Sequence, residues 1–197
     1  MLKVLGGCFY GCANLITVPN FNIIKVRTLY ETFANCYNLT SVPDFNTEKV
    51  ANMAFTFSNC RNLIYVPNFN LHNTRDTQCM FYGCTNLVNI PLLNMNNATW
   101  IGSMFRECPN LSENSIANIT NMLPNANQLS NRYISDIGLN LSRFDDDQLR
   151  ILNNKGYIDA IAPEEGVPQN YYNISWDGIG GFNDDGSGDS GDSGDFD

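Results

Sequence analysis

The sequence predicts an α/β solenoid built from coils of 24 residues, with short parallel strands, helical turns and a helical cap at the C-terminal end. The first observation behind this prediction is a set of cysteines that recur every 24 residues. The second is that several other residue types keep the same step. A fixed period of this length is the signature of stacked coils, each of which contacts only its neighbours. The recurring cysteines are Cys12, Cys36, Cys60, Cys84 and Cys108.

The repeat unit reads F-x-x-C-x-N-L-x-x-(V/I)-P-x-(F/L)-N. Leu and Val or Ile mark a short strand in each unit, and the proline ends it because proline cannot extend a hydrogen-bonded ladder. In residues 50–60 the apolar residues lie three to four apart, which predicts a short helical turn. One coil cannot bury its apolar side alone, so we expect the stacked coils to share one core.

The recurrent asparagines and cysteines are expected to be structural. Stacked Asn side chains can pair with backbone groups at the turns, although a generic turn role is also possible. The cysteines in register are expected to be small buried thiols that stay reduced, since no signal peptide is evident. Cys8 and Cys12 form a C-x-x-x-C pair that lacks two further ligands for zinc. We therefore expect no metal and no cofactor.

The chain divides into three expected parts: a solenoid over residues 1–111, a helical cap over 112–162 and a tail over 163–197. In the cap, Ser112 is expected to begin a helix that Pro124 ends. Asp145 and Gln148 form a capping-box pattern for a second helix, which Gly156 closes.

The tail is expected to be a docking arm that contacts another chain. Its aromatic cluster is too large to leave exposed to water, and its acidic, low-complexity end cannot fold alone. The alternative is that the aromatic residues fold back onto the cap of the same chain. The residues predicted to dock are Tyr171, Tyr172, Trp176 and Phe182.

Charge and composition exclude several function classes. Residues 1–111 hold seven Lys and Arg against five Asp and Glu, whereas the remaining residues hold four against fifteen, so no basic stripe for nucleic acid exists. No apolar run reaches membrane length, and the first residues meet Gly6 too soon to form a signal peptide. His72 is the only histidine, which weakens any nucleophile–histidine catalytic proposal. We therefore expect no enzyme activity and no catalytic residues.

The expected binding surface is the strand face, formed by residues that flank the core positions of each strand. The side chains on this face are mildly apolar and nearly uncharged as a set, which suits a protein or glycan partner. The alternative is that these are merely solvated strand positions. The predicted binding residues are Thr17, Ser41, Tyr65, Asn89, Asn20, Asp44, Asn68 and Leu92.

The repeat resembles the BspA-like leucine-rich repeats of bacterial surface proteins and the related repeats of mycoplasma lipoproteins and phage tail proteins. The segment 80–91, Met-Phe-Tyr-Gly-Cys-Thr-Asn-Leu-Val-Asn-Ile-Pro, carries the resemblance, and 104–111 repeats it. The resemblance covers about residues 8–111 and implies leucine-rich-repeat-like coils. The cap segment 111–119, with Ile137-Gly138-Leu139 and Lys155-Gly156-Tyr157 after it, resembles the closing segment of such repeats in phage and prophage tail-associated proteins.

These resemblances imply a non-enzymatic interaction or structural module. The favoured setting is a phage virion, as a tail or fibre component made in the host cytoplasm and used in assembly or host attachment. One alternative is a fragment of a BspA-like adhesin on the bacterial cell surface. Another is an intracellular inhibitor that acts through its acidic tail. The expected partners are proteins of a larger assembly, or a cell-surface protein or glycan, with no nucleic acid and no membrane insertion.

Overall fold

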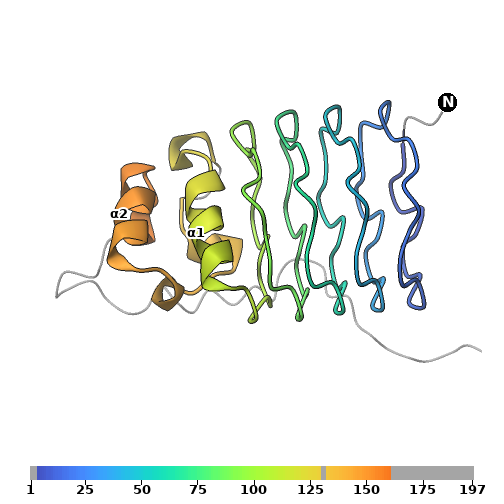
Figure 1. Cartoon of the computed structure of the whole chain (residues 1–197). Coiled ribbons are helices and arrows are strands. Elements are labelled where there is room, and N and C mark those ends of the chain that lie inside the picture. The colour runs from blue at the N-terminus through green and yellow to red at the C-terminus, as the bar shows by residue number, and fades with distance from the viewer. Residues whose placement is uncertain (1–3, 130–131, 161–197) are drawn as a thin grey trace, which may run out of the picture. The chain divides into compact units, whose positions relative to one another are not determined.

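The computed structural model describes residues 4–129 and 132–160, which belong to one compact unit, Met1–Ala162. Five coils follow one another along this unit, as Figure 1 shows. The first residues of the coils pair with one another in consecutive parallel bridges. A further parallel bridge joins Tyr65 to Asn89. Each bridge joins residues 24 apart, and the first residues of the coils are Val4, Thr28, Asn52, Asp76 and Trp100.

The first eight residues of each coil form successive turns, whereas the sequence pattern predicted a helical turn. Alternate N–H groups donate to the next coil; that of Phe33, for example, reaches the carbonyl of Thr56 at 2.9 Å. The N–H groups between them close turns within the coil. The N–H group of Thr32, for example, donates to the carbonyl of Leu29. Two residues per coil have positive φ, which a helix excludes. They are Gly7 and Gly11, Glu31 and Asn35, Phe55 and Asn59, Cys79 and Gly83, and Ser103 and Glu107.

Between the recurring Leu and the proline, where strands were predicted, the described residues form one isolated parallel bridge, Tyr65 with Asn89, and no longer strand; the other four bridges lie at the first residues of the coils. On the side opposite the turns, the N–H groups of Val88 and Asn89 both donate to the carbonyl of Ile64, at 2.9 and 3.2 Å. The backbone is therefore paired between coils on both sides of the core. We propose to class this coil stack as a leucine-rich-repeat-like solenoid, on the 24-residue offset of its pairings.

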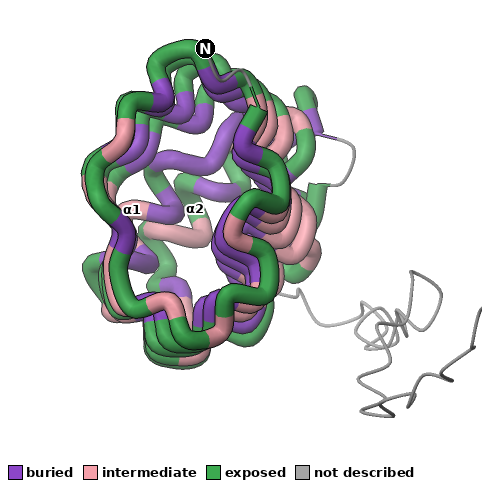
Figure 2. Tube along the Cα trace, turned by 90° about the vertical axis from the view of Figure 1, so that its right-hand side faces the viewer, coloured by how far each residue is buried: buried purple, intermediate pink, exposed green. Residues whose placement is uncertain are grey.

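A stack of phenylalanine rings runs through the core. The rings of Phe33 and Phe81 lie on either side of Phe57, with centroid distances of 5.6 and 5.8 Å and interplanar angles of 4°. Phe9 and Phe105 continue the stack at its two ends, at 5.3 and 5.7 Å from their neighbours. Figure 2 looks along the stack from the N-terminal end and shows the buried residues lining its inside. Identical rings therefore repeat at one register through all five coils.

The cysteines lie beside this ring stack. The thiol of Cys60 donates to the backbone carbonyl of Phe33 at 3.1 Å, and Cys36, Cys84 and Cys108 make the same bond at the 24-residue step before and after it. Cys36, Cys60, Cys84 and Cys108 are buried, which confirms their predicted role as small core residues. Cys12 differs: it is exposed, since no described residue lies over the first coil.

The recurrent asparagines have two structural roles. The side-chain oxygens of Asn22, Asn46, Asn70 and Asn94 each accept the N–H group two residues later and close a turn. At these positions Asn therefore has the generic turn role, which was the alternative to a ladder of stacked Asn side chains. The asparagines of another register pair between coils instead, with Asn62 donating to the side-chain oxygen of Asn38 at 3.1 Å.

Two α-helices and four short 3-10 helices follow the coils. The helix α1 spans Glu113–Met122, and α2 spans Asp146–Asn154. The side chain of Ser112 caps α1, and a complete capping box between Asp145 and Gln148 begins α2, so both predicted helix starts are confirmed. The 3-10 helices are η1 (Ala126–Gln128), η2 (Ser135–Ile137), η3 (Leu141–Arg143) and η4 (Ile158–Ala160).

The segment around η2 takes the place of a sixth coil. The N–H groups of Ser103 and Phe105 donate to the carbonyls of Asp136 and Ile137, as coil residues donate to the next coil. At the other side of this region, the ammonium group of Lys155 donates to three carbonyls at the end of α1, those of Thr120, Asn121 and Leu123, each at 2.8 Å. A cation at this end also suits the helix dipole. The C-terminal end of the coil stack is therefore covered.

Candidate binding faces

The strand face lies on the surface of the coil stack, on the side opposite the turns. Of its eight predicted residues, Ser41 is half-buried and the other seven are exposed: Thr17, Tyr65, Asn89, Asn20, Asp44, Asn68 and Leu92. They form two rows that cross the first four coils, since each row repeats at the coil period. The sequence period therefore brings residues from four separate segments onto one surface.

Apolar side chains occupy a large part of the strand face. Ile16, Ile64, Tyr65 and Leu92 are 48–60% exposed, although each is large and apolar. Asp44 is the one charged residue in the two predicted rows. Isolated exposed apolar residues are ordinary, but here four of them lie on one surface that spans four coils.

The backbone holds the strand face rigid. The row of Thr17, Ser41, Tyr65 and Asn89 lies beside inter-coil hydrogen bonds, such as that from Thr40 N–H to the Ile16 carbonyl at 2.9 Å. The helix α1 continues the same edge, because the Ser115 hydroxyl donates to the Val88 carbonyl and accepts the Ile90 N–H, each at 2.8 Å. A rigid surface loses little conformational entropy when it binds a partner.

A second face, which we call the turn face, was not predicted from the sequence. It is formed by exposed aromatic and apolar residues of the turn segments: Val4, Tyr10, Tyr30 and Trp100. Trp100 is 54% exposed, and Tyr30 packs edge-on against Phe55 at a centroid distance of 5.9 Å. These positions hold different residues in each coil, so no recurring sequence signal marks them. Only the alternation of turn and inter-coil hydrogen bonds shows which side chains point outward.

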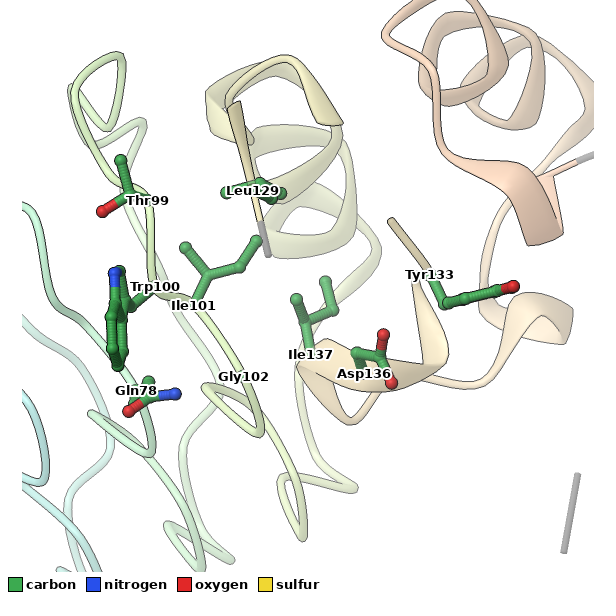
Figure 3. A pocket seen from close by; sticks show the side chains of 9 residues that line it. All are labelled: Gln78, Thr99, Trp100, Ile101, Gly102, Leu129, Tyr133, Asp136 and Ile137. Atoms are coloured by element: carbon green, nitrogen blue, oxygen red, sulfur yellow. The ribbon is translucent and has the colours of Figure 1, made fainter. Parts of the chain in front are cut away.

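A small cavity lies beside Trp100, where the last coil meets the segment around η2 (Figure 3). Gln78, Leu129 and Asp136 contribute to its lining. Burial raises the pKa of the Asp136 carboxyl, and the nearby Asp159 carboxylate raises it further. The cavity volume of about 40 Å³ leaves space for a few water molecules and not for a metabolite.

A wider, shallow hollow of about 310 Å³ lies over Arg75, Asn97 and Gln128. The amide groups there already donate to the backbone: Asn97 to the His72 carbonyl at 2.7 Å and Gln128 to the Asn96 carbonyl at 2.8 Å. These donors stabilise the coil edges. They are therefore not free to orient a substrate.

Residues 4–129 and 132–160 contain no group of three or more His, Cys, Asp or Glu side chains that could hold a metal ion. No helix in this part of the chain is both long and apolar enough to cross a membrane. The predicted docking residues Tyr171, Tyr172, Trp176 and Phe182 lie outside the described residues.

Comparison with known proteins gives one family. Neither a curated protein nor a solved structure matches the chain. A family model described as "Mycoplasma protein of unknown function, DUF285" matches residues 3–119, which include all five coils and most of α1. This match covers more than half of the sequence. The chain therefore belongs to the DUF285 family of Mycoplasma proteins.

Proposed function

We propose that this protein is a non-enzymatic interaction module that binds a macromolecular partner through its strand face. The observation that carries the proposal is the continuity of that face: exposed, nearly uncharged residues from four coils lie on one hydrogen-bonded surface. Interface centres are depleted in charge and enriched in aromatic residues. A protein or glycan partner fits this chemistry better than a small metabolite, which needs an enclosed pocket.

Tyr65 and its neighbour Ile64 are the proposed anchors of the contact. Both lie near the middle of the face, and about half of each side chain is exposed. Aromatic side chains near the centre of an interface tend to contribute most of the binding energy. Thr17, Ser41 and Asn89 flank the anchors along the same row and supply hydroxyl and amide groups for a partner.

We further propose that the module works within a phage virion, as part of a tail or fibre. The support for this setting is the resemblance of the cap segment 111–119, and of the motifs that follow it, to the closing segments of tail-associated repeat proteins. The BspA-like character of the repeats supports a second setting, attachment at a bacterial cell surface. In both settings the strand face binds a partner that is exposed on an assembly or a cell.

The binding test uses the fluorescently labelled full chain, a glycan array and intact bacterial cells. We expect the Ile64→Ser/Tyr65→Ser double variant to lose at least about tenfold in affinity, the effect of removing roughly 1.4 kcal/mol of contact energy. Trp100→Ser is the matched control, because it removes an equally exposed aromatic side chain from the turn face. Equal binding by the double variant and the wild type would refute the role of the strand face.

The setting is tested with an antibody raised against the chain. Detection of the protein in purified virions, at a fixed ratio to a tail protein, supports the virion setting. Labelling of intact cells without any virion signal supports the cell-surface setting. Detection only inside lysed cells contradicts both settings and favours an intracellular inhibitor.

A further inference from the structure

On the outer side of the first coil, no residue among 4–129 and 132–160 covers the core positions. Phe9, Leu15 and Phe21 are half-buried, whereas the residues in the same register of the next coil are at most 4% exposed. Cys8 and Cys12 are exposed, although the equivalent Thr32 and Cys36 are fully buried. We call these five residues of the first coil the end face; it faces the viewer in Figure 2. The residues in register are Thr32, Phe33, Cys36, Leu39 and Phe45.

The backbone of the same coil carries unused hydrogen-bonding groups along two flanks. On the turn side, no described residue donates to the carbonyls of Val4, Gly6, Cys8 and Tyr10, whereas their counterparts Thr28, Tyr30, Thr32 and Ala34 all accept from the first coil. On the strand side, the N–H groups of Asn14 and Ile16 have no acceptor in the described chain. The counterparts Asn38 and Thr40 donate to the first coil at 3.2 and 2.9 Å.

These two flanks make the end face complementary to itself. One flank presents only acceptors, and the other presents donors. The chain runs along them in opposite directions, because the coil closes on itself. A two-fold axis parallel to the flanks brings the acceptor flank of one copy opposite the donor flank of the other, in antiparallel orientation. The apolar end-face side chains of both copies then meet at the centre and leave water.

We propose that two copies of this chain associate head to head through their end faces and form a closed dimer. The opposite end of the coil stack is not open to the same contact, since Ser103 and Phe105 already donate to the segment around η2. Each copy therefore has one matching end, and association stops at two copies instead of growing into a fibre.

The charge of the first coil gives this dimer a distinctive salt dependence. Lys25 and Arg27 are exposed, and residues 4–27 contain no Asp or Glu. Two first coils carry like charges and repel each other at low ionic strength. Added salt screens this repulsion and strengthens the dimer. Salt would instead weaken the docking of an acidic partner on the same face.

The experiment is light scattering after size-exclusion chromatography of the full chain, in reductant, over a range of protein and salt concentrations. We expect the molar mass to rise with protein concentration to twice that of the monomer. At high salt this rise should occur at a lower protein concentration. Cys12→Lys should halve the mass, because it places a charge in the centre of the contact. Trp100→Lys is the control: it makes the same charge change at an exposed turn-face residue of the last coil and should leave the dimer intact.

Cys8→Lys is the second test variant, since Cys8 is also exposed in the single chain and its replacement buries no charge there. Circular dichroism of each variant checks that the coils remain folded. A wild-type chain that stays monomeric at every concentration overturns the proposal. So does a dimer that persists in both cysteine variants, or a dimer that added salt dissociates.

Discussion

Replacing Phe57 by Ala removes one ring from the middle of the phenylalanine stack. The ring is 1% exposed and packs on Phe33 and Phe81 at 5.6 and 5.8 Å, with Phe69 a further 5.9 Å contact. Truncating a buried Phe costs about 3–5 kcal/mol through lost burial and the cavity that remains. Two of the three ring contacts lie in neighbouring coils, and each stacked pair adds about 0.5–1.5 kcal/mol beyond burial. We therefore expect a loss in the upper half of the 3–5 kcal/mol range.

The assay is urea unfolding followed by circular dichroism, with the free energy of unfolding extrapolated to water. Tyr65→Ala is the matched control, because it also truncates an aromatic ring but at a site that is 51% exposed. We expect it to change stability by no more than about 0.5 kcal/mol. A loss below about 1 kcal/mol for Phe57→Ala would show that the ring is not part of a packed core, and the ring stack would be refuted.

Three further predictions concern the thiols and one glycine. Under native, reducing conditions, at protein concentrations where the chain is monomeric, a maleimide should label Cys8 and Cys12 quickly and leave the buried Cys36, Cys60, Cys84 and Cys108 unlabelled until the chain unfolds; without reductant, mass spectrometry should find no pair among the recurring cysteines, and a stoichiometric disulfide there would contradict the reduced core. Burial raises the pKa of Cys36 from 9.0 to about 11 and that of Cys108 to about 12. The folded thiols therefore keep protons that the unfolded chain releases above about pH 9, so their contribution to stability falls as the pH rises, from about 9 to 11 for Cys36 and from about 9 to 12 for Cys108. Urea unfolding across this range should give a shallower pH dependence for Cys36→Ala than for the wild type, and equal slopes would argue against a buried thiol. Gly138 has φ of +87°, and a Cβ there would overlap the backbone of Arg106, so Gly138→Ala should lower the midpoint of thermal unfolding more than Gly7→Ala, which meets no atom within 4 Å.

Much of the arrangement could be predicted from recurrence alone. The 24-residue step between the cysteines is also the offset of every parallel bridge in the described chain. The helix starts at Ser112 and Asp145 follow from local side-chain chemistry, which the sequence carries in full. Such features depend on residues that are close in sequence or identical in every coil.

Other features could not be predicted because they depend on backbone conformation. Apolar residues three to four apart suggested a helical turn in residues 50–60, but Phe55 and Asn59 have positive φ and begin a new turn each time. The glycines at 7, 11 and 83 were a signal for this conformation, since glycine tolerates it best. The turn face was missed for the same reason: without the turn geometry, the outward direction of Tyr30 or Trp100 could not be assigned.

The positive-φ positions have a consequence for how such a chain can change over evolution. Each coil needs the same two left-handed residues, four apart, to return the backbone to the next coil in register. Insertion or loss of one residue between the two positive-φ residues of a coil would disturb the alternation of turn and inter-coil hydrogen bonds in that segment, whereas gain or loss of a whole coil keeps all pairings. The length of the stack therefore varies in steps of one coil, about 4.8 Å each. The number of coils then sets how far the strand face extends, independently of the sequence that any one coil displays on it.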